Sequence, residues 1–354
     1  MQNCMRKYIN EFAIKFAVLM QKQLYNWKQI QSEERKNLYN LKSFGFYLLV
    51  ILIGFIPGRN EHDYSFTFHC WLSFFCLIGG IFMNIKWKNK AYQNKIKSKL
   101  FPELLKVFNE NIHYSRGGGI TSNSFFNQMI NYNSISDFIN KSGEIYTDKI
   151  IPNNVFEDSN LYTEEITQRE DDDIFWGEYK DVEFFMNEVD FGWVSNSRRR
   201  IYHSMFHGLA MKFSMNKNLS FRVLILTKHS FTKIPPNYER VTLEYEKFNK
   251  KYDVWVEKDE AQSGYGQIEA RYLLNTAFME RLLQIQTSFK VNKMCCSILN
   301  NRMLIMLSTN RDLFEMNHLL GKVDDVSQYN VLFDEFASVL SFIEVLNLSS
   351  KTHL

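Results

Sequence analysis

Residues 201–227 read IYHSMFHGLAMKFSMNKNLSFRVLILT, and this stretch decides the fold class that we predict for most of the chain. The part 201–215 follows a period of two, which is typical of one long strand or of a pair of strands. The run 221–227 is short and apolar, and we interpret it as a buried strand. A β-sheet is therefore expected at the centre of this region.

The neighbouring segments continue the same pattern in both directions. Further strands are predicted at 174–186 (two strands around a turn), 241–243, 252–256, and as a hairpin of 293–299 and 303–307. Helices are predicted at 268–284, broken in two by a cap at Asn275–Thr276, and at 326–348. Strands in series with helices attached predict an α+β module with a mainly antiparallel sheet and flanking helices.

Two uncharged runs lie upstream of this module. They are FGFYLLVILIGFIP at 44–57 and YSFTFHCWLSFFCLIGGIFMNI at 64–85. A bilayer core of about 30 Å needs about 20 helical residues, so the second run is long enough, and the first is if it extends to residue 41. The loop between them, 58–63, is polar and short. We therefore predict a two-helix transmembrane hairpin with spans of about 41–57 and 64–85, the alternative for the first run being a buried core helix.

The lysines around these runs predict an orientation. Basic residues precede the first run and follow the second, whereas the loop between the runs holds only Arg59. The positive-inside rule then places both termini in the cytoplasm of a multi-pass inner-membrane protein. The expected domains are a cytosolic helix at 1–40, the hairpin at 41–86 and a cytosolic α+β domain at 87–354. The lysines after the second run are either a plain topology signal or contacts to membrane lipid; they include Lys86, Lys88, Lys90 and Lys95.

The first 40 residues predict an amphipathic helix. Apolar residues, among them Phe12 and Phe16, recur at spacings of three and four, with charged residues on the other face. An apolar stripe of this kind needs a contact. It could pack on the chain's own helix after the second run, on a partner coiled coil, or at the lipid interface.

Composition and charge exclude several classes of protein. A hydrophobic share of 45% with 31 Phe is ample for a core, which excludes a disordered chain. Residues 1–100 hold 15 Lys and Arg against 5 Asp and Glu, and the remainder holds 27 against 34. A mildly acidic main part argues against a nucleic-acid partner. Five cysteines without paired spacing indicate neither a disulfide framework nor a zinc site.

Three groups of residues are candidates for a metal or redox site. His203 and His207 are four apart, but on a strand this spacing separates them by about 13 Å, so we interpret them as structural or surface histidines. The acidic run 170–173 could hold a divalent cation, although a solvated charge run is the preferred interpretation. Cys295 and Cys296 are adjacent on a predicted strand, so at least one belongs to the core. The sequence therefore predicts no catalytic residue, no metal and no cofactor.

Several strings of the second half resemble a known family. They are FHGL at 206–209, FRVLIL at 221–226, VTLEYEKFNKKYDVWV at 241–256, IEARYLLNTAFMERLLQI at 268–285 and IEVLNL at 343–348. Together they resemble an uncharacterised bacterial membrane-protein family, classed as a domain of unknown function. The resemblance implies two adjacent membrane spans followed by a cytosolic module, and extends over nearly the whole chain.

The resemblance is most specific at 269–272 and 278–282. It makes Glu269, Arg271 and Tyr272 candidates for binding a ligand or partner, although a structural salt-bridge network is the preferred role for the first two. Some family members are encoded beside LemA-like coiled-coil membrane proteins, which suggests such a partner. The resemblance supplies no reaction.

Three functional hypotheses follow from these patterns. The first is a membrane-anchored interaction or scaffold module that docks a partner protein through a sheet edge or the groove beside helix 268–284. The second is a structural subunit of an envelope complex, held by its N-terminal and C-terminal helices. The third is an enzyme of unrecognised type with Glu269, Arg271 and Asp253 around a pocket, which the lack of any known catalytic motif disfavours.

Overall fold

The computed structural model describes residues 2–38, 63–117, 149–196, 200–229, 234–258, 264–291, 293–315, 319–323 and 326–351. The chain forms two compact units, which are described separately. The first, the sheet unit, comprises Met1–Glu11, Leu105–Phe314 and Asn330–Leu354. The second, the helical unit, comprises Phe12–Leu104 and Glu315–Tyr329.

A seven-stranded antiparallel sheet forms the centre of the sheet unit. Its strands are β1 (Ile112–Arg116), β2 (Gln168–Tyr179), β3 (Val182–Val194), β4 (Tyr202–Thr227), β5 (Tyr238–Val241), β6 (Tyr252–Glu257) and β7 (Lys293–Ser308). They follow the order β1-β2-β3-β4-β6-β5, and β7 also pairs with β4. Every strand pair is antiparallel. The predicted antiparallel sheet with flanking helices is therefore confirmed.

Strand β4 organises the sheet because three strands pair with it. Its first half, 202–213, pairs with β3, and its last five residues, 223–227, pair with β6. β7 pairs with β4 from Gly208 to Leu226, with register shifts between Ser214 and Val223. Register shifts of this kind bend a strand, so β4 and β7 carry the sheet through a bend.

The predicted hairpin at 293–307 is wrong, since this segment is one strand, β7. The triplet Asn300–Arg302 reads as a turn in the sequence, and Asn300 has a left-handed φ of +54°. In the structure Asn300 pairs with Leu219 between the two register shifts, so the chain bends there and does not reverse.

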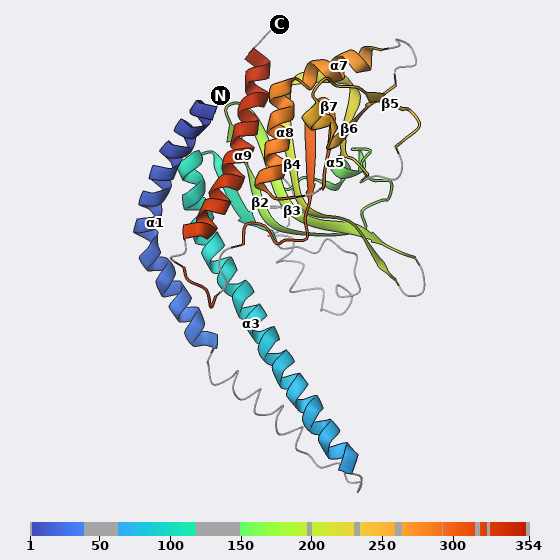
Figure 1. Cartoon of the computed structure of the whole chain (residues 1–354). Helices are drawn as coiled ribbons and strands as arrows, with labels where there is room; N and C mark the ends of the chain where they lie inside the picture. The colour runs from blue at the N-terminus through green and yellow to red at the C-terminus, as the bar shows by residue number, and fades with distance from the viewer. Residues whose placement is uncertain are drawn as a thin grey trace, which may run out of the picture. The chain divides into compact units, whose positions relative to one another are not determined.

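One face of the sheet, here called the helix face, is covered by two helices (Figure 1). These are α8 (Thr276–Ser288) and α9 (Val326–Lys351). Phe342 of α9 meets Phe213 of β4 at 5.4 Å between ring centroids and Phe278 of α8 at 5.5 Å. Phe336 of α9 meets Phe175 of β2 at 4.9 Å. Aromatic packing therefore holds the helices on this face.

The opposite face, here called the segment face, is covered by residues 149–167, the covering segment, which include the short helix α5 (Asn153–Glu157). Phe156 packs on Phe191 of β3 at 4.9 Å. Arg169 anchors the end of the segment with a bidentate contact to Asp171 (2.8 and 2.7 Å) and a hydrogen bond to the Ile151 carbonyl (2.6 Å). Because both charges are buried, loss of either side chain would leave the other charge without a partner and destabilise the anchor.

The acidic run 170–173 lies in β2, and the interpretation as a solvated charge run is wrong for two of its members. Asp171 is the carboxylate that Arg169 binds, and Asp173 is fully buried. Tyr114 of β1 donates a hydrogen bond to Asp173 at 2.6 Å, and burial, followed by the nearby Asp173 charge, raises the pKa of this tyrosine. Local polarity could not reveal this burial, because Ile151, which Arg169 binds, and Tyr114, which binds Asp173, come from other segments.

The helical unit contains most of α1 (Gln2–Leu38) and of α3 (Asp63–Phe108). Trp27 of α1 and Tyr92 of α3 are buried, and burial raises the pKa of Tyr92 to about 12. Glu34 of α1 pairs with Lys95 of α3. The N-terminal helix therefore packs on α3 near Trp27 and Glu34, whereas the contact of its predicted apolar stripe, which includes Phe12 and Phe16, stays a prediction.

The segment 319–321 joins this helix pair through backbone carbonyls. Gln31 donates to the carbonyls of Leu319 (3.0 Å) and Gly321 (2.7 Å), and Arg35 donates to the same two at 2.9 and 2.7 Å. The buried Lys97 pairs with Glu315 at 2.5 Å. Asn89 of α3 accepts the Leu319 N–H at 2.7 Å. Side chains of both helices thus satisfy backbone groups of a segment that has no regular secondary structure of its own.

The predicted transmembrane hairpin is wrong, and so is the predicted multi-pass location in an inner membrane with both termini cytoplasmic. Within the residues that the structure describes, no helix has the combined length and apolarity needed to cross a membrane. The predicted span 64–85 is part of α3, a helix of 46 residues that continues through a lysine-rich half to Phe108. Two of the lysines used for orientation, Lys95 and Lys97, bind carboxylates of the protein. The predicted span 41–57 lies outside the described residues.

Candidate functional site

A groove of about 710 Å³ lies beside α8 and α7 (Tyr265–Leu273). Its apolar wall consists of Leu243, Leu274 and Met279, whose side chains are buried. Polar groups complete the lining, among them Arg271 at the end of α7 and Glu244. A groove of this volume with both apolar and polar lining residues can bind a ligand or a partner segment.

Short-range contacts fix the walls of this groove. Asn275 caps α8 by accepting the Phe278 N–H at 3.0 Å, which confirms the cap predicted between the two helices. Tyr245 donates a hydrogen bond to Glu280 of α8 and so ties the loop 242–245 to that helix. Asn249 donates to the Leu243 carbonyl at 2.5 Å. The groove is therefore preformed, which lowers the entropy cost of binding.

The three candidate residues on α7 lie in three different environments. Glu269 accepts the backbone N–H groups of Ser220 (2.9 Å) and Phe221 (3.3 Å) of β4, so its carboxylate holds α7 on the sheet. Arg271 is exposed and lines the groove. Tyr272 lies on the outer side of α7, where the Lys217 ammonium is 3.9 Å from its ring centroid.

The enzyme hypothesis required Glu269, Arg271 and Asp253 around one pocket. Arg271 lines the groove, whereas neither of the two carboxylates is among its lining residues. Asp253 instead binds Arg240 at 2.5 Å. The structure does not bring these three residues together.

The outer side of α7 carries an apolar stripe, of which the sequence analysis named only Tyr272 as a candidate. Tyr265, Ile268 and Tyr272 are 57%, 62% and 54% exposed, and they recur at intervals of three and four residues on one side of the helix. The opposite side is buried, and Gly266 allows a close approach because an added Cβ would lie 3.0 Å from Val256. The sequence predicted this helix only from residue 268, so Tyr265 fell outside it and the stripe was not recognised as a whole.

Residues 204–348 match the family model described as "Protein of unknown function (DUF3137)". The DUF3137 region begins in β4 and ends in α9, and it includes α7, α8 and the groove. The expectation of an uncharacterised family is confirmed for this region, which is much less than the whole chain. The match shows nothing about a membrane.

Curated proteins and solved structures show little further similarity to this chain. No curated protein matches the chain. One solved structure, "crystal structure of the mycobacterial trehalose monomycolate transport factor A, TtfA", is similar at a TM-score of 0.30 with 7% sequence identity. The alignment covers 67% of this chain and 88% of that chain. At so low a score the likeness carries no argument about fold or function.

The predicted histidine and cysteine sites take structural positions. His207 lies 3.2 Å from Asp190, whereas His203 stacks on Trp193 at 4.2 Å between centroids, so the two histidines do not converge. No cluster of three or more potential metal ligands occurs among the described residues. Cys295 and Cys296 are both buried, and burial raises the pKa of Cys295 to about 12. A thiol in this state is unreactive at neutral pH.

The remaining candidates lie on α1 and α3. Phe12 and Phe16 fall within α1, but their side chains are outside the described set. Lys86, Lys90 and Lys95 are exposed and Lys88 is half-buried. Their contact with lipid stays a prediction.

Proposed function

We propose that the chain is a protein-interaction or scaffold module whose docking surface is α7 and the groove beside it. The observation that supports this proposal is the exposed stripe of Tyr265, Ile268 and Tyr272 next to a preformed groove of about 710 Å³. Three large apolar side chains on one helix face are costly to leave in water, and such surfaces often mark interaction sites.

The groove favours a polypeptide partner of particular chemistry. Leu243, Leu274 and Met279 offer apolar contacts, and Arg271 offers a guanidinium at the edge of that apolar wall. A partner segment with apolar side chains and a carboxylate matches both features. A LemA-like coiled-coil protein is the partner we propose to test first, since the resemblance of this sequence suggests such proteins.

A position-specific cross-link tests the proposal. A photo-reactive amino acid is placed at Ile268 in the full-length chain, and at Ile201, which is 50% exposed just before β4, as the matched control. One cross-linked protein, obtained from position 268 and absent from position 201, is the expected result. Arg271→Glu should reduce its yield at least about fivefold, whereas Lys293→Glu, another exposed charge reversal, should not. Equal labelling from both positions would contradict the proposal.

The subunit hypothesis retains one supporting observation. Ile14, Val18 and Tyr25 of α1 are 68%, 63% and 70% exposed. By contrast, Phe342 and Ile343 of α9 are buried in the chain's own core. If a larger complex uses this exposed side of α1, replacing Ile14 and Val18 with serine should abolish the partner's cross-link while Arg271→Glu leaves it intact.

A further inference from the structure

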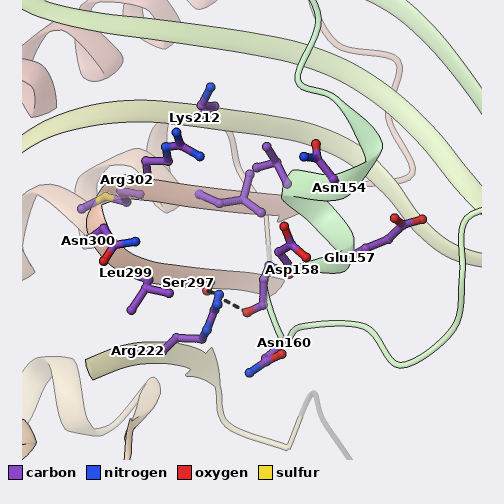
Figure 2. A pocket seen from close by; sticks show the side chains of 14 residues that line it. Asn154, Glu157, Asp158, Asn160, Lys212, Arg222, Ser297, Leu299, Asn300 and Arg302 are labelled. Atoms are coloured by element: carbon purple, nitrogen blue, oxygen red, sulfur yellow. Dashed lines mark hydrogen bonds between the residues drawn. The ribbon is translucent and has the colours of Figure 1, made fainter. Parts of the chain in front are cut away.

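A second cavity, of about 420 Å³, opens on the segment face of the sheet (Figure 2). Strand β4 contributes Lys212 and Arg222 to its lining, and β7 contributes Arg302. The covering segment contributes the amide of Asn154 and two carboxylates, Glu157 and Asp158. This cavity is separate from the α7 groove, since the two share no lining residue.

The register of β4 and β7 places two cations next to each other. Lys212 pairs with Leu304 and Ser214 pairs with Arg302, so Lys212 and Arg302 are diagonal neighbours on the same face. Diagonal neighbours of this kind lie roughly 7 to 8 Å apart, and both long side chains can then reach one small ion between them. Figure 2 shows Lys212 and Arg302 on the same side of the cavity, away from Arg222.

The surroundings of Lys212 reduce its contact with water but do not neutralise it. Its ammonium lies 5.0 Å from the centroid of the Phe185 ring. Burial, followed by the charge of Arg302, lowers the pKa of Lys212, and the carboxylate of Glu183 partly opposes this. Among the described residues, neither Lys212 nor Arg302 has a carboxylate oxygen within 4.0 Å. Two adjacent cations without a direct counter-charge are unfavourable unless an anion joins them.

The rest of the cavity is rigid and polar. Ser297 of β7 donates to the Ser159 carbonyl at 2.7 Å, which fixes the covering segment to the sheet. Arg222 donates to the same Ser297 hydroxyl at 3.2 Å. Asn154 and Asp158 lie across the cavity from the Lys212–Arg302 side, as Figure 2 shows. Amide and carboxylate groups of this kind can accept hydrogen bonds from the hydroxyls of a ligand.

We propose that this cavity binds a small phosphorylated, hydroxyl-bearing molecule whose phosphate lies between Lys212 and Arg302. A phosphate monoester carries a charge of about −1.5 to −2 at neutral pH, which matches two adjacent cations better than the single charge of a carboxylate does. The arginine supplies paired N–H donors to the phosphate oxygens, and the lysine adds a point charge. A volume of about 420 Å³ accommodates a molecule the size of a sugar phosphate.

Calorimetric titration of the full-length chain at low salt tests this site. The probes are inorganic phosphate, glycerol 3-phosphate and glucose 6-phosphate, with glycerol, glucose and citrate as comparisons. We expect saturable binding of a phosphate monoester at least about tenfold tighter than binding of its dephosphorylated form. No heat of binding from any phosphate probe up to roughly 10 mM would overturn the proposal. Tighter binding of citrate than of every phosphate probe would overturn it as well.

Two substitutions and a matched control locate the site. Arg302→Gln and Lys212→Met should each weaken binding at least about tenfold. Lys217→Met is the control, because Lys217 lies on the same strand and burial also lowers its pKa, yet it does not line the cavity. Equal weakening by all three substitutions would show nonspecific attraction and overturn the proposal. Arg302 is exposed, so its variant keeps the test valid if Lys212→Met does not fold.

Discussion

The helix face and the segment face of the sheet differ in what fills them. Aromatic rings pack on both faces. Phe213, Phe278 and Phe342 meet on the helix face at centroid distances of 5.4 and 5.5 Å, and Phe156 meets Phe191 on the segment face at 4.9 Å. The segment face combines apolar contacts with the buried Arg169–Asp171 pair, and it leaves a polar cavity beside the covering segment. The helix face therefore contributes mainly stability, whereas the segment face combines stability with a place for a ligand.

The largest effect is expected on the helix face. Phe342→Ala removes a fully buried ring that contacts both the sheet and α8, and it should lower the free energy of unfolding by about 4 kcal/mol. Val331→Ala, at a position of α9 that is 38% exposed, is the control and should cost well under about 1 kcal/mol. Urea unfolding of the two variants measures both values. Similar losses for both would show that the aromatic contacts are not what holds α9 on the sheet.

The next effect concerns the segment face and is electrostatic. Asp171→Asn keeps the shape of the side chain but leaves the buried Arg169 guanidinium without its counter-charge, which should cost about 3 kcal/mol. Hydrogen exchange should also speed up in residues 149–167, because Arg169 holds the Ile151 carbonyl.

Asp172→Asn is the matched control for this change, since Asp172 is the next residue of β2 and is only half-buried. It should leave both the free energy of unfolding and the exchange rates close to those of the parent chain. Uniform acceleration of exchange over the whole sheet in Asp171→Asn would show global destabilisation, contrary to a local anchoring role.

The helix face also contains an ionisable group, so the pH dependence of the free energy of unfolding tests this face. Glu335 of α9 is buried, and burial raises its pKa from 4.5 to about 7, although Arg311 and Lys290 oppose the shift. The folded state thus holds the proton more tightly than the unfolded state. Glu335 should cost stability progressively as pH rises from about 4.5 to about 7, with the full cost above that range.

Glu335→Gln should accordingly have little effect near pH 5 and should stabilise the protein on the order of 2 to 3 kcal/mol near pH 8. Chemical unfolding at a series of pH values measures this difference. Glu344→Gln removes a carboxylate from the same helix, where Lys180 binds it at 2.6 Å, and serves as the control. The same pH profile in both variants would refute a specific role of the buried Glu335.

Local patterns of the sequence predicted the elements that depend on nearby residues. The period-two stretch at 201–215 and the apolar run at 221–227 were both predicted as strands, and the structure joins them in the single strand β4. The break between the two helices at Asn275 is present. The pairing of Lys212 with Arg302 could not be predicted in this way. These residues are 90 positions apart, and only the antiparallel register of β4 and β7 brings them together. The anchor at Arg169 was missed for a related reason, since its partner lies within a run that looks solvated.

The transmembrane prediction failed because it treated the run 64–85 as a complete element. In the structure this run belongs to α3, which continues for more than 20 residues beyond it. The lysines there were counted as membrane-flanking charges, but Lys97 is buried against Glu315. Charge counts along a sequence do not reveal whether a lysine faces solvent or a carboxylate of the same chain.

The smallest predicted effect concerns how α8 begins above the helix face. Asn275 accepts the Phe278 N–H, so Asn275→Ala leaves a helix-terminal donor without its side-chain partner and should cost about 1 kcal/mol. Thr276→Ala, one residue later, is the matched control because Thr276 follows the cap, and it should cost less. Asn275 and Thr276 also line the α7 groove, so cross-linking from position 268 is measured in both variants. Loss of stability with full retention of the cross-link would show that the cap supports α8 without contributing to partner binding, whereas loss of the cross-link alone would make Asn275 a contact residue.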